Sequence, residues 1–323
     1  MTTVLDPALR TLTRNQLNTL EPLRPMIDGI LDKGTVILLA AQPAAGKTFL
    51  AIDFLGCYIT GKQWQGHNVD NLVTYGGTDK PEHGSVLYIA GEGARGFNMR
   101  LTAWEENWNH QIPNNALEVF PHPINLSSPI QVDALCAYLE RNTFGLVIFD
   151  TLARCTVGLD ENTAKDMGRV IDNVYKIREA TGPDGTVIVI HHLGKNGEIR
   201  GSSSLEGGVD QVLRLEREGD YLTLRDTKRK DNIEFEPIDL FFKSTGSSRI
   251  ITAGSGTEWH QTNPLVTEMN SLGELLPLTE NKLSEYVGLP PHVFGKSLNR
   301  GLKSGDIVQS RAGKYPVYSL RQV

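Results

Sequence analysis

The segment 41–48, which reads Ala-Gln-Pro-Ala-Ala-Gly-Lys-Thr, constrains the fold of this sequence most. An apolar run at 35–40 precedes it, and a helical pattern at 47–60 follows it. This order is typical of a Walker A loop, with Ala41 in place of the first glycine. Such a loop binds phosphates through backbone N–H groups, a lysine and a Mg²⁺-binding hydroxyl. The predicted phosphate contacts are Gln42, Pro43, Ala44, Ala45, Gly46, Lys47 and Thr48, and Thr48 is also a predicted Mg²⁺ ligand.

Three further apolar runs, at 85–90, 146–149 and 186–190, have the length of β-strands. They are nearly continuous rather than alternating, which is typical of parallel strands covered on both faces. Helical patterns such as 131–142 and 163–181 lie between the runs. Strands separated by helices imply right-handed crossovers and a doubly wound or RecA-like sheet. With the Walker A pattern, we predict an α/β fold, a RecA-like P-loop NTPase core with a mainly parallel sheet.

A carboxylate directly follows the apolar run 146–149. Asp150 stands where a Walker B strand has its acidic residue. We expect this strand to lie beside the strand of the phosphate-binding loop, so that Asp150 joins the Mg²⁺ shell. The alternative is an aspartate that only caps a turn.

Residue 151 is threonine, whereas AAA+ ATPases usually place their water-activating glutamate directly after the Walker B aspartate. Glu92 stands at the end of the run 85–90, where a carboxylate can orient and polarise an attacking water. We predict that Glu92 is the catalytic base. A surface loop acid is the alternative.

Two histidines, His191 and His192, follow the run 186–190. A histidine at this edge of the sheet can hydrogen-bond a γ-phosphate and report its loss to a neighbouring loop. We expect one histidine to be structural and choose His192 as the sensor. A metal site is not expected, because a third ligand at a suitable spacing is missing.

The series of motifs resembles the RepA-type hexameric replicative helicases of plasmids and phages, within the RecA/DnaB-like superfamily. The resemblance covers roughly residues 25–240, and the matching segments are 41–48, 86–92, 147–152, 188–195 and 200–210. It implies ATP and Mg²⁺ as cofactors, held by Lys47, Thr48 and Asp150.

The resemblance also implies contacts between subunits of a homo-oligomer, expected to be a hexamer. Arg200 matches an arginine that reaches the ATP of the adjacent subunit, and a cation supplied there stabilises transition-state charge. Lys228 and Lys230 match a segment that offers basic residues to nucleotide across the interface. A solvated loop arginine and a charged hairpin turn are the alternatives.

In a ring of this kind, loops after the central strands point into the channel. The candidate loops are 154–166 and 193–200. We therefore predict that Arg154 and Lys195 contact single-stranded DNA. An ordinary mobile loop is the alternative for the second segment.

The C-terminal part has a different pattern. Helix-like segments at 264–277, 279–289 and 290–303 precede a hairpin pattern at 307–320, which together resemble a winged helix. Residues 285–323 carry a formal charge of +4. A winged helix places its recognition helix on duplex DNA, so Lys296 and Arg300 are candidate DNA contacts. Docking of a replication partner is the alternative.

These patterns divide the chain into four parts. We predict an N-terminal arm at 1–33, an ATPase core at 34–252, a Ser/Gly/Thr-rich linker at 253–263 and the winged-helix-like domain at 264–323. Residues 61–84 form a longer insertion than the resemblance predicts, with no role evident from the sequence.

The composition limits the partners and the cellular compartment that we expect for this chain. The net charge of −6 argues against an overall basic coat. No apolar run approaches the ~18 residues of a spanning helix, and no secretory signal is visible, so we expect a cytoplasmic protein without a membrane partner. Cys57, Cys136 and Cys155 are expected to be buried thiols.

The expected function is an ATP-dependent DNA helicase, a ring motor that translocates on single-stranded DNA in phage or plasmid replication. One alternative is a RecA-like ATPase that switches winged-helix DNA binding without unwinding. The other is a recombination or repair ATPase that processes DNA.

Overall fold

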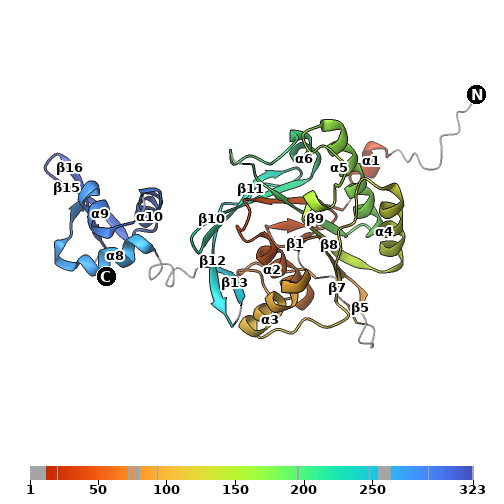
Figure 1. The fold of residues 1–323 in the computed structure, drawn as a ribbon, viewed down its shortest axis with the longest axis horizontal. Coiled ribbons are helices and arrows are strands. Elements are labelled where there is room, and N and C mark those ends of the chain that lie inside the picture. Colours follow the sequence, from red (N-terminus) through yellow and green to blue (C-terminus); the bar gives the residue numbers. More distant parts are fainter. Residues whose placement is uncertain are drawn as a thin grey trace, which may run out of the picture.

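The computed structural model describes residues 12–19, 21–71, 74–75, 81–92, 94–194, 196–246, 248–253, 263–289 and 291–321. Within them, the largest feature is a nine-stranded sheet of order β13-β12-β11-β10-β3-β9-β8-β6-β7 (Figure 1). Neighbours are parallel from β10 to β7 and antiparallel from β13 to β10. The strands are β3 (Val36–Ala41), β6 (Ser85–Ala90), β7 (Leu117–Phe120), β8 (Phe144–Asp150), β9 (Thr186–His192), β10 (Gln211–Glu218), β11 (Tyr221–Arg229), β12 (Ile238–Thr245) and β13 (Ser248–Ala253).

The continuous apolar runs form the centre of this sheet, as predicted. Every residue of β3 and β8 is buried, because helices cover both faces. Side chains alternate between two core clusters: Ile37 and Leu39 face one, and Val36 and Leu38 face the other. The predicted α/β architecture is therefore confirmed, with a large mixed sheet.

Two layers of helices flank the sheet (Figure 1). One core cluster includes residues of α2 (Lys47–Thr60) and α3 (Phe97–Trp108), and the other includes residues of α4 (Pro129–Arg141) and α5 (Ala164–Ala180). Ser128 and Thr163 cap α4 and α5 through their side-chain oxygens. The short helices are α1 (Arg14–Leu17), η1 (Ala94–Gly96), η2 (Leu152–Arg154) and α6 (Ser203–Gly208).

The expected N-terminal arm at 1–33 needs correction at its end. Strands β1 (Pro25–Ile27) and β2 (Leu31–Asp32) form a hairpin whose apolar residues belong to the core. Asp32 is also buried and pairs with Arg229 of β11 at 2.7 Å. The sequence does not predict these strands, because a segment of two or three residues is too short to show a periodic pattern.

Residues 61–71 of the insertion also pack onto the core. Trp64 is fully buried, and its ring lies 5.1 Å from that of Phe54. Val69 bridges to Ile27 of the N-terminal hairpin. Further along, β4 (Thr74–Tyr75) pairs with β5 (Pro81–His83).

The C-terminal elements form their own core cluster. Within the described residues, this part has three α-helices and a three-stranded antiparallel sheet of order β14-β16-β15, drawn in blue in Figure 1. The elements are α8 (Pro264–Leu272), η3 (Gly273–Leu275), β14 (Leu278–Thr279), α9 (Glu280–Val287), α10 (Pro291–Ser304), β15 (Ile307–Ala312) and β16 (Tyr315–Leu320).

The cysteines and the helix lengths bear on two predictions made from composition. All three cysteines are buried and free, as predicted. In the described part of the chain, every helix is too short or too polar to cross a membrane.

Candidate functional site

The phosphate-binding loop connects β3 to α2. Ala44 and Gly46 adopt φ values of +60° and +106°. A Cβ on Gly46 would lie 2.6 Å from the Phe242 ring, so glycine is required there by both conformation and space. The Lys47 ammonium donates to the carbonyls of Ala41 and Gln42 at 3.1 and 3.0 Å. The motif therefore folds as the expected strand–loop–helix unit.

Lys47 also contacts the predicted sensor. Its Nζ lies 3.2 Å from Nδ1 of His192. An ammonium has no acceptor, so Nδ1 must accept and the imidazole proton lies on Nε2. Nε2 is 3.8 Å from Oε1 of Glu92. Burial lowers the pKa of Lys47, and burial followed by the Lys47 charge lowers the pKa of His192. His192 is thus a neutral donor that faces Glu92 at neutral pH.

Asp150 receives two hydroxyl donors. Thr48 Oγ1 and Tyr88 Oη lie 2.7 and 2.5 Å from its Oδ2. The expectation that the Asp150 strand lies beside the loop strand is wrong, because β9 lies between β8 and β3. Contact is still made because Thr48 belongs to the first turn of α2, beyond the end of β3.

Glu92 lies just beyond β6, beside the same group. Ala90 is in register with Asp150, which places the carboxyl ends of β6 and β8 together. Oε1 of Glu92 accepts a 2.8 Å hydrogen bond from the Thr151 hydroxyl. The Glu92 side chain is 42 % exposed. Thr151 thus orients a carboxylate that solvent can still reach.

The other histidine is structural, as expected. His191 is buried, and its Nε2 donates to the Arg200 carbonyl at 2.9 Å. Burial lowers its pKa. The Arg200 N–H donates in turn to the His192 carbonyl at 3.1 Å. The backbone of Arg200 is thereby bonded to both histidines.

The Arg200 side chain pairs within its own chain. Its Nε donates to Oε1 of Glu161 at 2.6 Å, and the side chain is half exposed. The Ser202 N–H donates to the Glu161 carbonyl at 2.7 Å. The two loops that follow β8 and β9 are therefore joined through Glu161.

The predicted nucleotide contacts Lys228, on β11, and Lys230, just after it, lie away from the phosphate-binding loop. Lys228 pairs with Val212, which is in register with Leu38 in the middle of β3. Lys230 is exposed and lies 3.7 Å from Asp210. All three ammonium donors of Lys228 are bonded to the end of α6, so Lys228 does not face the nucleotide site of its own chain, and its contact across an interface stays a prediction. The acceptors are the carbonyls of Glu206, Gly207 and Val209.

The predicted DNA contacts are only partly described. Arg154 in η2 is exposed, and its Cβ would lie 3.0 Å from a Cβ on Gly91, next to Glu92. Lys195 lies outside the described residues. Lys296 and Arg300 belong to α10, but their side chains are not among those that the structure describes.

The donor set fits a magnesium–nucleotide complex. A hydroxyl and a carboxylate, Thr48 and Asp150, are the oxygen donors that Mg²⁺ prefers. The buried Lys47 charge lies at the helix N-terminus, where phosphates bind. Elsewhere in the described part of the chain, no cluster of three His, Cys, Asp or Glu side chains could hold a metal ion.

Sequence reasoning missed several residues of this site. Tyr88 lies within an apolar run, and its contact with Asp150 depends on strand order. The sequence shows only that residue 151 is not glutamate, whereas in the structure the Thr151 hydroxyl donates a hydrogen bond to Glu92. The Gln42 side chain has a contact that no sequence pattern predicts: it donates to the Gly194 carbonyl at 2.8 Å, which joins the loop to the segment after β9.

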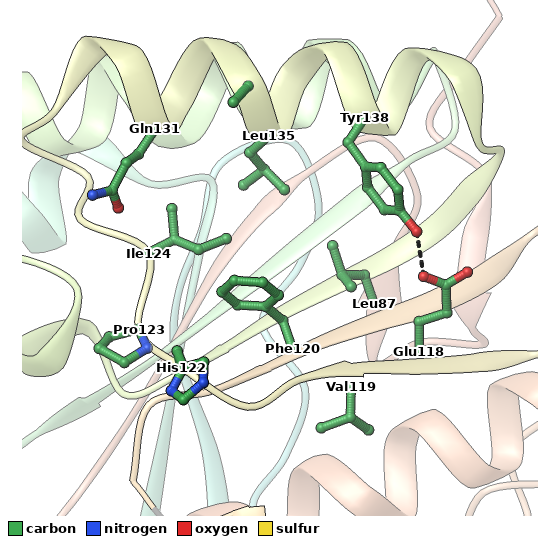
Figure 2. Close-up of a pocket in the computed structure, with 11 residues that line it drawn as sticks. Leu87, Glu118, Val119, Phe120, His122, Pro123, Ile124, Gln131, Leu135 and Tyr138 are labelled. Carbon is green, nitrogen blue, oxygen red and sulfur yellow. Dashed lines mark hydrogen bonds between the residues drawn. The ribbon is translucent and has the colours of Figure 1, made fainter.

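A separate apolar groove lies at the free edge of the sheet. Its volume is about 510 Å³. Figure 2 shows Phe120 and Ile124 pointing into the space below Leu135 of α4. The Tyr138 hydroxyl donates to Glu118 at its rim. No sequence pattern predicts this groove, because β7 has only four residues.

Two comparisons show what this chain is similar to. The sequence model of a family described as "AAA domain" matches residues 4–198. The DNA repair protein RadA of Aquifex aeolicus (strain VF5) is 27 % identical over 199 residues, which are 61 % of this chain and 37 % of RadA. Arg200 and all residues after it lie beyond the family match. With the loop, Asp150 and the sheet described above, these matches place the chain in the AAA domain family, as a RecA-like P-loop NTPase.

Proposed function

We propose that this chain is an ATP-driven DNA motor of the RepA/DnaB-like ring type, which translocates on single-stranded DNA. The observation that carries the proposal is the position of His192. Its ring faces Lys47 and Glu92, and its carbonyl accepts from Arg200 in the loop that follows. One residue thus joins the nucleotide site to the segment predicted to meet DNA.

Binding comes first. Bound MgATP supplies the phosphoanhydride bond that is hydrolysed. Lys47 would leave its present carbonyl partners and pair with the β- and γ-phosphates. Thr48 and Asp150 would hold Mg²⁺.

Glu92 would act as the base. The Thr151 hydroxyl fixes one carboxylate oxygen at 2.8 Å, and the partial exposure of Glu92 leaves room for a water. A carboxylate so held can accept a proton from the attacking water.

Coupling to DNA would run through β9. Because His192 is neutral, its Nε2–H can donate to a γ-phosphate and lose that partner after hydrolysis. The Arg200 backbone and Glu161 would transmit this change to the loops after β9 and β8. Arg154 and Lys195, on those loops, would contact the DNA backbone.

Assembly of several copies of this chain would complete each nucleotide site. The half-exposed Arg200 would release Glu161 and reach the nucleotide of a neighbouring copy in a homohexamer. Lys230 is exposed enough to contribute a second charge there.

The C-terminal elements would form a winged helix. Helix α8, strand β14, helices α9 and α10 and the β15–β16 hairpin follow one another in the order that such a domain requires. Helix α10 carries Lys296 and Arg300 and would present them to duplex DNA. Docking of a replication partner is the other use of this surface.

A repair or recombination ATPase is the second candidate. The likeness to RadA, a DNA repair protein by name, favours it. Both candidates require ATP hydrolysis with DNA. They differ in whether the protein displaces a strand.

Strand displacement on a forked duplex tests the proposal directly. With ATP and Mg²⁺, we expect directional unwinding by a species of hexamer mass, which Glu92→Gln abolishes. A hexamer that hydrolyses ATP with single strands but never displaces one would favour the repair candidate. A monomer whose hydrolysis ignores DNA would refute both.

A further inference from the structure

We propose that Arg217 is a positioning residue that fixes the phosphate-binding loop before nucleotide enters, with Phe242 as its support. Both residues lie beyond the part of the chain that the family match covers. The inference rests on the nucleotide site of the proposed function and deepens it.

The sheet register brings Arg217 to the loop. Leu215 of β10 is in register with Ala41, the last residue of β3. Strand β10 continues to Glu218, so its final residues extend beside the loop that follows Ala41. Leu213 and Leu215 belong to the core cluster that includes α2. Alternation along the strand places Arg217 on that same face.

Arg217 binds the loop backbone. One terminal nitrogen donates to the Ala44 carbonyl at 2.7 Å, and Nε donates to the Gly219 carbonyl at 2.7 Å. The guanidinium is planar and rigid, so it fixes Ala44 relative to the turn between β10 and β11. Asp220 lies 3.9 Å from the remaining nitrogen.

The peptide group held by Arg217 is fixed at both ends. The Ala45 N–H, in the same planar unit as the Ala44 carbonyl, donates to the Gln42 carbonyl at 3.2 Å. Ala44 has φ +60°, a conformation that residues with a side chain rarely adopt. The loop therefore holds an unfavourable backbone geometry, and Arg217 is one of the contacts that stabilise it.

Phe242 supports this arrangement from β12. The Arg217 guanidinium lies 4.8 Å from its ring centroid, at the distance of a cation–π contact. Phe242 also lies against Gly46 and against Phe49, whose ring meets it edge-on at 5.3 Å. Phe242 thus contacts both Arg217 and the start of α2.

A loop already in its binding geometry loses less conformational freedom when phosphate binds. Arg217 should therefore raise affinity for any polyphosphate, with or without a base. If Arg217 instead stacked on the nucleobase, it would raise affinity for nucleotides alone.

Calorimetric titration of the full chain separates these cases. The probes are ATP, ADP and inorganic tripolyphosphate, each with Mg²⁺. For Arg217→Ala we expect Kd to rise about tenfold for all three, since a charge-assisted hydrogen bond contributes roughly that factor. In ATP hydrolysis, KM should rise while kcat changes little. Arg217→Lys should recover part of the affinity.

Arg225→Ala is the matched control. Arg225 lies on the neighbouring strand and makes an exposed 3.4 Å pair with Glu216. It should leave all three Kd values unchanged. Should Arg217→Ala fold poorly, Arg217→Lys and Phe242→Leu provide the same comparison with smaller changes.

Two results would overturn the inference. One is unchanged affinity in folded Arg217 variants, and the other is a loss for ATP and ADP that spares tripolyphosphate. The binding measurement needs neither DNA nor strand displacement. A protein that binds MgATP but never responds to DNA would refute the proposed motor and leave this inference standing.

Discussion

The Thr48 hydroxyl donates a 2.7 Å hydrogen bond to Asp150, although a whole strand separates β3 from β8 in the sheet. The intervening strand ends in His192, which contacts Lys47 at 3.2 Å. The phosphate-binding loop, the predicted Mg²⁺ ligand Asp150 and the predicted sensor His192 therefore meet at one edge, because three strands end there. Glu92 joins them from β6.

Glu92→Gln should separate binding from turnover. The amide keeps the shape of the carboxylate but cannot accept a proton, so we expect ATP binding within about threefold of wild type and a loss of hydrolysis of at least ~100-fold. Single-turnover hydrolysis and nucleotide binding measured on the same preparation check this. Lys47→Ala is the contrasting variant, because it should lose binding as well. Near-normal hydrolysis by Glu92→Gln would assign the base elsewhere.

Thr151→Val should lower kcat about five- to tenfold and leave KM unchanged. The substitution keeps the shape of the side chain but removes the hydroxyl that donates to Glu92, and one hydrogen bond contributes about 1 kcal/mol. Thr151→Ser retains the donor and should restore most of the rate. Equal rates for the valine and serine variants would show that the hydroxyl does not orient Glu92.

Arg200→Ala should act on neighbouring subunits. We expect a loss of hydrolysis of at least ~100-fold in the pure variant, because a cation near the transferred phosphate is removed. Mixed with an equal amount of wild type, the variant should bring the total rate below half. Glu161→Gln removes the partner of Arg200 within the chain and should be far milder. Activity that falls only in proportion to dilution would exclude a contact between subunits.

Asp53→Asn should change how stability depends on pH. Asp53 is fully buried on α2 and accepts hydrogen bonds from Trp104 and Gln65 at 2.8 and 2.9 Å. Burial raises its pKa to about 6 from an ordinary value of 3.8. Between pH 4 and 6 the folded chain holds a proton that the unfolded chain releases, so the free energy of unfolding falls as pH rises through that window.

The Asp53→Asn variant lacks the titrating carboxyl group, so its free energy of unfolding lacks this dependence on pH. The difference in unfolding free energy, wild type minus Asp53→Asn, should therefore fall by on the order of 3 kcal/mol from pH 4 to pH 6 and stay level above it. Urea denaturation of both proteins across pH 4–8 measures this difference. The contribution of histidine titration cancels because both proteins have the same histidines. A difference independent of pH would place the pKa of Asp53 at its ordinary value.

The sequence predicted the core of this site because its signals are local. The runs that became β3, β6, β8 and β9 are continuous and apolar, and Gly46 to Thr48 follow the first of them directly. Asp150, Glu92 and His192 each stand at the end of a run. Parallel strands bring such ends to one edge, so these residues could be grouped without knowledge of the order of the strands.

Strand order and side-chain partners were beyond local reasoning. The adjacency of β8 to β3 was predicted wrongly because no sequence pattern encodes which parallel strands are neighbours. Lys228 was assigned to nucleotide by resemblance, but the end of α6 lies close enough to take its three donors. Arg217 reaches the loop only because β10 extends past β3, and Phe242 reaches it from β12, which is separated from β10 by β11 in the sheet.

ATP hydrolysis by the full chain, measured with and without single-stranded DNA, distinguishes a DNA-dependent ring motor from an ATPase that does not respond to DNA. Solution mass should be followed in the same samples. For a ring motor we expect hydrolysis that depends on Mg²⁺ and Glu92, rises at least ~10-fold with single strands, and accompanies a hexamer-sized species. Hydrolysis that ignores DNA, in a monomer or dimer, would contradict the proposed ring motor.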